Sequence, residues 1–455
     1  MTAKVRRSRF RGIGGIHPPY CKSATAGHPI ETMPPPVRLL VSLHQNSGSP
    51  SNPLVKRGDA VLRGQPVGEP SGYFSSAVHA PVSGLVKSVE TMTTVTGRTA
   101  AVVEIESDGR DLPFVPEPPP LDWNTGPPGR LIERIAEAGI IGMGGAGFPT
   151  HVKLSPLPGK PVHTLILNGA ECEPYLTADH RLMVEQAETV WRGAQILARI
   201  LGVKAVRIAI EDNKSDAIWA MEKVLAGTDA DVEITVLETE YPQGAEKQLI
   251  HSVLGREVPS GGLPIHVGVL VENVATTAAV YDAVTGGLPL MHRVITVSGD
   301  CVATPKNVLA RVGTPLGDLL AFCGGQASDP GKILCGGPMM GIALDSLEPG
   351  IDKTTSGLLL FHASRVHCYT SMPCIRCSRC VRACPMHLLP CTLSETIEAE
   401  DYASAENIQV MDCIECGSCA YVCPAHRPLV QHMKQGKTRV AWMREKRKST
   451  MAETR

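Results

Sequence analysis

The sequence of 455 residues contains no long apolar run. Its best candidate, residues 264–290, is interrupted by His266, Glu272, Asn273 and Asp282, so no window supplies the roughly 18–20 uncharged apolar residues of a membrane-spanning helix. The N-terminal segment is basic, yet no apolar signal core follows it. We therefore expect a protein that stays in the cytoplasm and has no transmembrane segment of its own.

Aromatic residues and an excess of charge of either sign are also scarce. Phe, Trp and Tyr make up 4% of the chain, and 44 Lys and Arg residues balance 45 Asp and Glu residues for a net charge of −1. A general nucleic-acid binder needs a broad basic surface, and stacking on bases needs aromatic rings. We therefore expect no nucleic-acid partner. The 43% of hydrophobic residues can build cores, and at roughly 150 residues per domain the length suggests about three domains.

Cysteines, in contrast, are abundant and clustered. The chain has 15, and eight of them fall within two runs, CIRCSRCVRACP at 374–385 and CIECGSCAYVCP at 413–424. Each run reads C-x2-C-x2-C-x3-C-P, the pattern of bacterial two-cluster ferredoxins. Zinc sites usually show two C-x2-C pairs separated by a longer spacer, so the doubled pattern favours two [4Fe–4S] clusters over zinc. Adjacent clusters of this kind pass single electrons.

The spacing also predicts which cysteines share a cluster. Three thiolates two residues apart can surround one cluster, while the fourth, which precedes proline, ligates the other cluster. We interpret the remaining nearby cysteines, Cys368 and Cys391, as ordinary buried thiols. The predicted ligand sets are Cys374, Cys377, Cys380 and Cys423 for cluster 1, and Cys413, Cys416, Cys419 and Cys384 for cluster 2.

The succession of patterns along the chain predicts a multidomain α/β protein. The run HAPVSGLV at 79–86 resembles the hairpin of biotinyl- and lipoyl-type barrel-sandwich domains, whereas strands alternate with helices after residue 129, which predicts a Rossmann-like, mostly parallel sheet. The C-terminal tail is basic; we expect a solvated helix that is dispensable for the chemistry, with contact to acidic headgroups as the alternative. The predicted units are an extended N-terminal arm (1–36), a barrel-sandwich-like β domain (37–110), a Pro-rich linker (111–128), an α/β nucleotide domain (129–288), a β-grasp module (289–350), an α-helical two-[4Fe–4S] ferredoxin-like domain (351–430) and a basic tail (431–455).

Three polar loops in the α/β region are candidates for one binding pocket. They read GMGGAGFP at 142–149, NGAECEP at 168–174 and YPQGAEK at 241–247. The first lets the backbone approach a planar or phosphorylated ligand closely, and the other two follow predicted strands, whose carboxyl ends carry ligands in such sheets. The alternative for the glycine loop is a bare turn, and for Glu171 and Glu173 it is ordinary surface charge.

These loops, in this order, are similar to those of the NADH- and flavin-binding subunit of respiratory complex I. With the barrel-sandwich region before them and the doubled cysteine motif after them, residues 10–430 resemble the C subunit of the Rnf complex, an ion-translocating ferredoxin:NAD oxidoreductase of bacterial membranes. The resemblance implies FMN and two [4Fe–4S] clusters as cofactors and NADH as substrate. It also implies membrane subunits as partners, ferredoxin as an indirect partner, and a peripheral position on the cytoplasmic side of the inner membrane.

The same resemblance implies roles for individual residues. Glu173 matches the carboxylate that holds the nicotinamide amide, and we assign it as the catalytic residue. The sequence departs from complex I at Met143, where complex I has arginine, and at Ala170, where it has aspartate. The implied cofactor-binding residues are Gly142, Gly144, Gly145, Ala146, Gly147, Phe148, Lys153, Asn168, Glu171, Glu173, Tyr241, Gly244, Glu246, Asn273 and Thr276.

The sequence therefore predicts an electron-input subunit, in which hydride passes between NADH and FMN and single electrons pass through the clusters to membrane partners. One alternative is a soluble flavin and iron–sulfur dehydrogenase or hydrogenase accessory subunit with no membrane partner. Another is a flavin-free relay protein, in which the acidic loops are structural.

Overall fold

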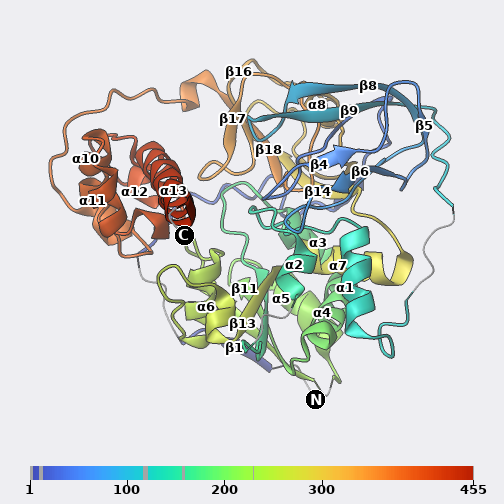
Figure 1. The fold of residues 1–455 in the computed structure, drawn as a ribbon, viewed down its shortest axis with the longest axis horizontal. Helices are drawn as coiled ribbons and strands as arrows, with labels where there is room; N and C mark the ends of the chain where they lie inside the picture. Colours follow the sequence, from blue (N-terminus) through green and yellow to red (C-terminus); the bar gives the residue numbers. More distant parts are fainter. Residues whose placement is uncertain (1–3, 10–13, 116–120, 156–158, 229, 454–455) are drawn as a thin grey trace.

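The computed structural model of the chain describes residues 4–9, 14–115, 121–155, 159–228 and 230–453. It confirms the predicted multidomain α/β fold. In Figure 1 a small β domain lies at one end of the molecule and a group of helices that carries the cysteine motifs lies at the other. A parallel α/β domain and a second sheet fill the space between them.

The β domain consists of two small antiparallel sheets that enclose an apolar core. Alternation along its strands turns Leu39, Val41, Val103 and Ile105 inward, where all four are completely buried. One sheet contains, in spatial order, β3 (Arg38–Ser42), β9 (Thr99–Ser107), β8 (Gly84–Thr93) and β5 (Ala60–Val61); the other contains β4 (Ser51–Pro53), β6 (Pro66–Pro70) and β7 (Val78–His79).

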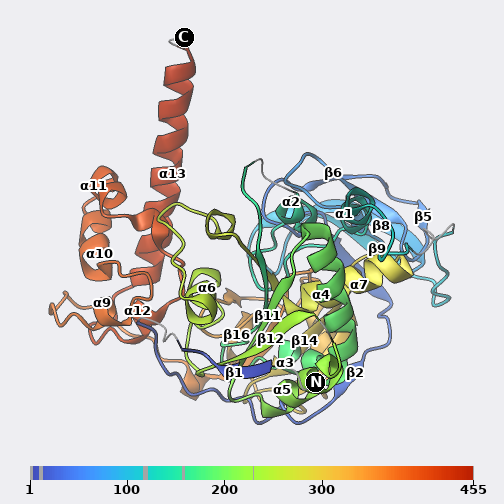
Figure 2. The same ribbon diagram turned by 90° about the horizontal axis from the view of Figure 1, so that it is seen from below.

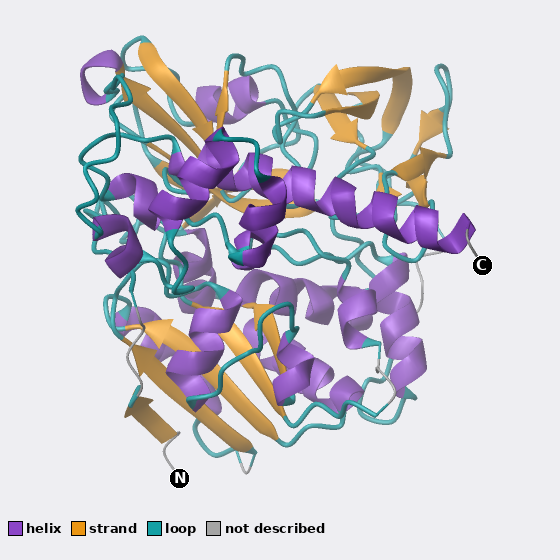
Figure 3. Ribbon diagram, turned by 60° about the vertical axis from the view of Figure 1, so that its left-hand side comes forward, coloured by secondary structure: helices purple, strands orange, loops and turns teal. Residues whose placement is uncertain are grey.

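The α/β domain is built on a five-stranded sheet in which all neighbouring strands are parallel. The strands over residues 164–169 and 269–273 read as near-continuous apolar runs because helices cover both faces of the sheet (Figure 3). The sheet contains, in spatial order, β1 (Lys4–Arg7), β12 (Asp231–Leu237), β11 (Ala205–Glu211), β10 (Thr164–Gly169) and β13 (Val269–Asn273).

One helix covers one face of this sheet and most of the others cover the opposite face. Residues 178–201 form two helices and not one, because Gln186 leaves helical geometry at φ −128° and ψ 33°. The helices are α1 (Pro128–Glu137), α2 (Thr150–Leu154), α3 (Ala178–Glu185), α4 (Ala187–Leu201), α5 (Ser215–Leu225), α6 (Glu246–Leu254), the 3-10 turn η1 (Pro264–Val267) and α7 (Val274–Gly286). Of these, α6 packs on one face of the sheet together with the turn η1, whose Val267 joins the same apolar cluster.

A second, six-stranded sheet with one short helix forms the β-grasp module. Its strand β18 lies beyond residue 350, so the expected domain boundary there would cut through the sheet. The spatial order is β17 (Ile342–Leu344), β16 (Pro330–Cys335), β18 (Gly357–His362), β14 (His292–Ser298), β15 (Lys306–Arg311) and β2 (Ile30–Thr32), and the helix is α8 (Leu316–Phe322). The 3-10 turn η2 (Ala363–Arg365) follows β18.

The N-terminal arm, expected to lie extended on the surface, contributes a strand to each of two sheets. Its strand β1 pairs in parallel with β12, and β2 pairs in parallel with β15. Between them, the backbone of Ile16 bridges that of Tyr241. The arm therefore connects the α/β domain, the β-grasp module and, as shown below, the cysteine motifs.

The helices that carry the two cysteine motifs form a separate lobe, which we call the cysteine domain. They are α9 (Arg379–Ala383), α10 (Pro390–Glu398), α11 (Tyr402–Asn407), the 3-10 turn η3 (Val410–Asp412), α12 (Ser418–Tyr421) and α13 (Leu429–Glu453).

The expected basic tail is not a separate segment. Figure 2 shows α13 as a long helix whose far end projects from the molecule, but Leu429, Met433 and Val440 in its first half are buried in the lobe. The expected boundary at 431 therefore falls inside a packed helix. Among the described residues, no helix combines the length and the apolar character needed to cross a membrane.

Candidate functional site

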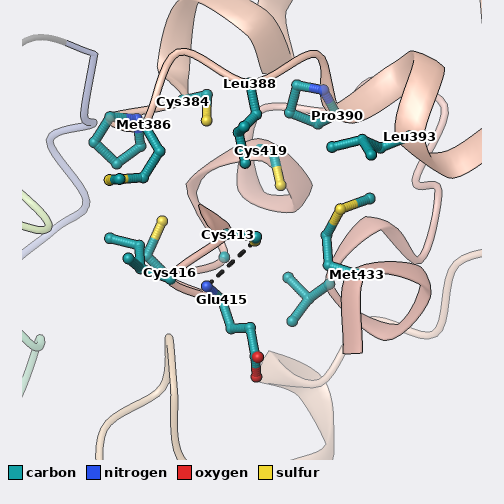
Figure 4. A pocket seen from close by; sticks show the side chains of 14 residues that line it. Cys384, Met386, Leu388, Pro390, Leu393, Cys413, Glu415, Cys416, Cys419 and Met433 are labelled. Carbon is teal, nitrogen blue, oxygen red and sulfur yellow. Dashed lines mark hydrogen bonds between the residues drawn. The ribbon is translucent and has the colours of Figure 1, made fainter. Parts of the chain in front are cut away.

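The second cysteine motif encloses a small apolar cavity. Cys413, Cys416 and Cys419 line it together with Cys384 from the first motif, and Figure 4 shows the four thiols around a common space. Leu388, Leu393, Val430 and Met433 are among its apolar walls. The structure thus brings together the four cysteines assigned to cluster 2.

The first motif encloses a similar cavity of its own. Cys374, Cys377 and Cys380 line it together with Cys423 from the second motif, which is the set assigned to cluster 1. Cys391 also lines this cavity, half-buried. The expectation that Cys368 is buried is wrong, since it is exposed on the segment before the motif.

The donor sets of both cavities fit [4Fe–4S] clusters. The cavity of the second motif offers four cysteine thiols and that of the first motif offers five, its four assigned ligands and Cys391, and few polar groups line either. Within the described parts of the chain, no three His, Cys, Asp or Glu side chains are placed to hold a single metal ion. The assigned thiols of each set instead line a common cavity. This arrangement favours a multi-atom cluster in each cavity.

The two motifs share one backbone conformation. Arg376 and Ser378 in the first, and Glu415 and Gly417 in the second, all have positive φ angles, of 54°, 58°, 58° and 82°. This left-handed winding turns the backbone N–H of the residue two positions after the first cysteine toward its sulfur, at 3.4 Å in each motif. The C-x2-C-x2-C spacing therefore folds the same way twice.

The polar loops of the α/β domain meet at one end of its parallel sheet. The glycine loop lies over the start of α7, where a Cβ on Gly144 would come within 3.3 Å of the Asn273 side chain. The loops after β10 and β12 are joined because Asn168 Nδ2 donates to the Gly244 carbonyl at 2.9 Å. Close approach also requires Gly244, whose Cβ would lie 2.4 Å from the Ala170 carbonyl oxygen.

Lys153 supplies a positive charge beside these loops. Its Nζ lies 3.2 Å from Glu246 and 3.6 Å from Glu272, and it donates to the Val271 carbonyl. Burial alone would lower the pKa of Lys153, but the two carboxylates outweigh it and raise that pKa, so the ammonium stays charged at neutral pH. Glu272 itself is only 2% exposed.

Open backbone beside this charge fits a planar, phosphorylated cofactor. Gly144, Gly145 and Ala146 are exposed, and a Cβ on Gly145 would meet no atom within 4 Å. The loop therefore presents bare peptide groups to an open space, and backbone N–H groups near an ammonium suit a phosphate. The residues present fit FMN.

Three predicted site residues make contacts within the protein. The Glu173 carboxylate accepts hydrogen bonds from the backbone N–H groups of Met339 and Met340, at 3.0 and 2.8 Å, in the turn between β16 and β17. Thr276 is completely buried and accepts a hydrogen bond from Met143 N at 2.8 Å, so it anchors the glycine loop. Tyr241 is 1% exposed and its hydroxyl donates to the Cys416 carbonyl at 2.6 Å.

Two other predicted residues are occupied by contacts within the domain. Asn273 caps α7 by accepting from Ala275 N and Thr276 N, and it donates to Asp179 at 2.6 Å. Glu171 accepts from the backbone N–H groups of Asp179 and His180 at the start of α3, at 3.0 and 3.2 Å. Burial raises the pKa of Glu171, and Lys22 partly offsets this.

Sequence reasoning missed Lys22 of the N-terminal arm. Its Nζ donates to the carbonyl oxygens of Glu171, Glu173 and Leu176, at 2.8 and 2.9 Å for the first two. The ammonium thereby fixes the backbone of the whole acidic loop. A single lysine in an irregular, Pro-rich segment carries no periodicity or motif that could have indicated this role.

Family models divide the chain in the same order as the structure. They match the RnfC barrel sandwich hybrid domain over residues 9–110, the Nuo51 FMN-binding domain over 135–282, the SLBB domain over 294–343 and a 4Fe-4S dicluster domain over 369–424.

Curated relatives match nearly the whole chain. The C subunit of the proton-translocating ferredoxin:NAD(+) oxidoreductase complex of Clostridium ljungdahlii is 46% identical over 439 residues, covering 96% of this chain and 95% of the relative. The C subunit of the Na(+)-translocating ferredoxin:NAD(+) oxidoreductase complex of Acetobacterium woodii is 44% identical, covering 97% and 99%. The C subunit of the ion-translocating oxidoreductase complex of Rhodobacter capsulatus is 43% identical, covering 94% and 83%.

Proposed function

The chain belongs to the family of C subunits of ion-translocating ferredoxin:NAD(+) oxidoreductase complexes, and from this membership we propose that it is the electron-input subunit of such a complex. NADH is its substrate, FMN and two [4Fe–4S] clusters are its cofactors, and other subunits of the complex are its partners. Ferredoxin exchanges electrons with it indirectly, through those subunits.

The contact between Tyr241 and Cys416 is the observation that carries this proposal. Tyr241 belongs to the nucleotide loops and Cys416 to the second cysteine motif, and the hydrogen bond of 2.6 Å joins them through a buried side chain. Ile16, Cys172 and Met339 pack around the same contact. The nucleotide site and the cluster cavity therefore meet at one buried hydrogen bond surrounded by apolar side chains. This close contact is suited to electron transfer between the two sites.

The chain's residues orient and insulate the reactants. FMN supplies hydride exchange with NADH and one-electron transfer, and the clusters supply one-electron transport. For this chemistry Lys153, on the helix that follows the glycine loop, holds a positive charge between Glu246 and Glu272, while Lys22 and Asn168 fix the acidic loop and the loop after β12. Burial raises the pKa of Cys172 to about 12, so this thiol, between the two sites, stays protonated and unreactive.

We also propose a peripheral position at the cytoplasmic face of a bacterial inner membrane. The relatives are named as subunits of ion-translocating complexes, which must sit in a membrane, and NADH is available inside the cell. Inside-out membrane vesicles test this. We expect the chain to be digested by protease added to them and to be released by high salt; a chain protected in such vesicles contradicts the proposal.

Purification under anaerobic conditions tests the cofactors and the activity together. We expect about eight irons and eight acid-labile sulfides per chain, a flavin shoulder in the visible spectrum, and NADH-dependent reduction of an artificial electron acceptor. Eight irons without flavin and without NADH oxidation would favour the flavin-free relay. Full activity with no co-purifying membrane subunits would favour the soluble dehydrogenase or accessory subunit.

A further inference from the structure

Two large aromatic side chains lie exposed beside the glycine loop. Tyr73 and Phe74 belong to the turn between β6 and β7 of the barrel-sandwich domain, and they are 59% and 52% exposed. In a chain with 4% aromatic residues, two adjacent exposed rings at the edge of a binding loop are unusual. None of the roles assigned above uses them.

These rings extend an aromatic surface that begins on the glycine loop itself. The ring centroids of Phe74 and Phe148 lie 6.0 Å apart, those of Tyr73 and Phe74 5.3 Å apart, and those of Tyr73 and His151 6.1 Å apart, all edge-on. Phe148 ends the glycine loop and His151 lies on α2. Two domains thus contribute to one ring cluster at the rim of the nucleotide site.

The backbone beneath the rings is fixed in place by hydrogen bonds. The Phe74 carbonyl accepts from Ser49 N at 2.9 Å, and Ser47 N donates to the Gly147 carbonyl at 2.8 Å, so one short segment holds both the aromatic turn and the glycine loop. Gly48 permits this approach: its φ is 116°, and a Cβ there would lie 2.1 Å from the Phe74 carbonyl oxygen. The exposure of the rings is therefore built into the fold.

We propose that Tyr73 and Phe74 bind the adenine ring of the dinucleotide substrate at the rim of the nucleotide site. The inference deepens the proposed function and rests on it, since it requires NADH as substrate. A dinucleotide carries two planar rings, and the one that does not react is free to bind away from the flavin. Exposed aromatic rings bind nucleobases by stacking, and these adjoin the glycine loop, whose open backbone suits phosphate.

Affinity for ligands that carry or lack adenine tests this contact directly. ADP-ribose carries the adenine but no nicotinamide and does not react, so its affinity for the flavin-loaded chain can be measured by calorimetry. We expect the double variant Tyr73→Ala/Phe74→Ala to weaken ADP-ribose binding by about tenfold or more, the usual effect of removing a base-stacking ring. The KM for NADH should rise similarly, whereas the KM for reduced nicotinamide mononucleotide, which has no adenine, should stay unchanged.

Matched variants separate ring stacking from a structural effect. Tyr73→Phe/Phe74→Tyr keeps both rings and should bind ADP-ribose like the wild type, with unchanged flavin content in both double variants. Trp219→Ala removes a comparably exposed ring, 64% exposed on α5, and should change none of these values.

Two outcomes overturn the inference. Unchanged ADP-ribose affinity in the double alanine variant removes the rings from the site, and an equal rise in KM for NADH and for the mononucleotide shows that their effect does not involve adenine. A wild-type chain that oxidises no NADH contradicts the proposed function; the ADP-ribose titration still decides the ring contact in that case.

Discussion

The two cysteine motifs share one backbone fold but have different surroundings. At matching positions the first motif carries Ile375 and Arg376, both exposed, and the second carries Ile414 and Glu415, both partly buried. Ser378 of the first motif is exposed, whereas its counterpart Gly417 is buried against the Met339 carbonyl, where a Cβ would lie 3.2 Å from that oxygen.

The difference arises from what covers each motif. The second motif packs against Tyr241 of the nucleotide loops, Ile16 of the arm and Met339 of the β-grasp module, three segments far apart in the sequence. The loop of the first motif is open, with Arg379 exposed beside Arg376, and only the end of this motif meets the arm, where Gly15 N donates to the Ala383 carbonyl at 3.1 Å. The second motif thus adjoins the nucleotide site, whereas the loop of the first motif is accessible from solvent.

The largest losses of iron should come from replacing Cys384 or Cys423, because each of these cysteines lines the cavity of the other motif. Cys384→Ala should eliminate the cluster in the cavity of the second motif, and Cys423→Ala the cluster in the cavity of the first, because each thiol lines the cavity built by the other motif. Each variant should retain about four of eight irons. Iron analysis and electron paramagnetic resonance of the reduced protein distinguish which cluster remains.

Cys368→Ala is the control for these two variants. Its thiol is exposed and lines neither cavity, so the variant should retain about eight irons. Loss of the same spectroscopic signal in Cys384→Ala as in Cys374→Ala would mean that Cys384 ligates the cluster of its own motif and not that of the other motif.

Shortening α13 should affect the second cavity more than the first. Deletion of 434–455 removes Gly436, which fits closely against Ile397, and Val440, which is completely buried. It also removes Lys437, whose Nζ donates to the Cys413 carbonyl at 2.9 Å. The expectation that this segment is dispensable is therefore replaced by its opposite: we expect loss of the cluster held by Cys413, Cys416, Cys419 and Cys384, to about four irons per chain.

Deletion of 449–455 is the matched control for this truncation. It leaves Val440, Lys437 and the ion pairs of Arg444 and Arg447 with Glu406 in place. The shorter deletion should keep about eight irons and NADH-dependent acceptor reduction. Eight irons in the longer deletion as well would show that α13 does not support the cavity.

Removal of the Glu173 carboxylate should lower the stability of the protein more than it changes the KM for NADH. Its carboxylate accepts from Met339 N and Met340 N, and Met339 in turn touches Gly417. Glu173→Ala should lower the free energy of unfolding by about 1.5–3 kcal/mol, the usual net value of a hydrogen bond to a charged group. Denaturant unfolding measures this, and the KM for NADH should stay within about threefold of the wild type, since that much is under 1 kcal/mol.

The exposed Glu238 supplies the control for Glu173. Glu238→Ala removes a carboxylate from the neighbouring loop after β12 and should change neither the stability nor the KM. A Glu173→Gln variant of normal stability that loses tenfold or more in NADH turnover would return this residue to the nicotinamide contact inferred from the resemblance.

The cysteines and Glu173 also show what the sequence could and could not predict. The two cavities follow from spacing because each set of three ligands lies within seven consecutive residues and the pattern occurs twice. The α/β order and the meeting of the polar loops follow from strands alternating with helices. Glu173 could not be placed, because its partners are backbone N–H groups 166 and 167 residues away that leave no mark in the sequence.

Two of the expected domain boundaries, at 350 and 431, fall inside packed structure for a related reason. A strand pattern shows that β18 is a strand but not that it pairs with β14 and β16, across the point where the module was expected to end. The basic residues of α13 predict a solvated face, while the buried positions Met433 and Val440 on the same helix are visible only once the helix is packed. In both cases the boundary depends on contacts between residues that lie far apart in the sequence.

The smallest predicted effect is the shift in reduction potential of each cluster when a nearby positive charge is removed. Lys437 lies beside the second motif, paired with Glu415 and bonded to the Cys413 carbonyl, and both partners of the ion pair are about one quarter exposed. A positive charge stabilises the reduced, more negative cluster, so Lys437→Met should lower the potential of the cluster in the second cavity. For an interaction of about 0.5–1 kcal/mol and a one-electron couple, the shift is about 20–40 mV. Redox titration followed by electron paramagnetic resonance measures it, with Lys437→Arg as the control that keeps the charge.

Arg376→Gln should shift the potential of the first cluster by less, because solvent screens the exposed guanidinium. Equal shifts at both clusters in either variant would mean that the two cavities do not differ in their exposure to solvent.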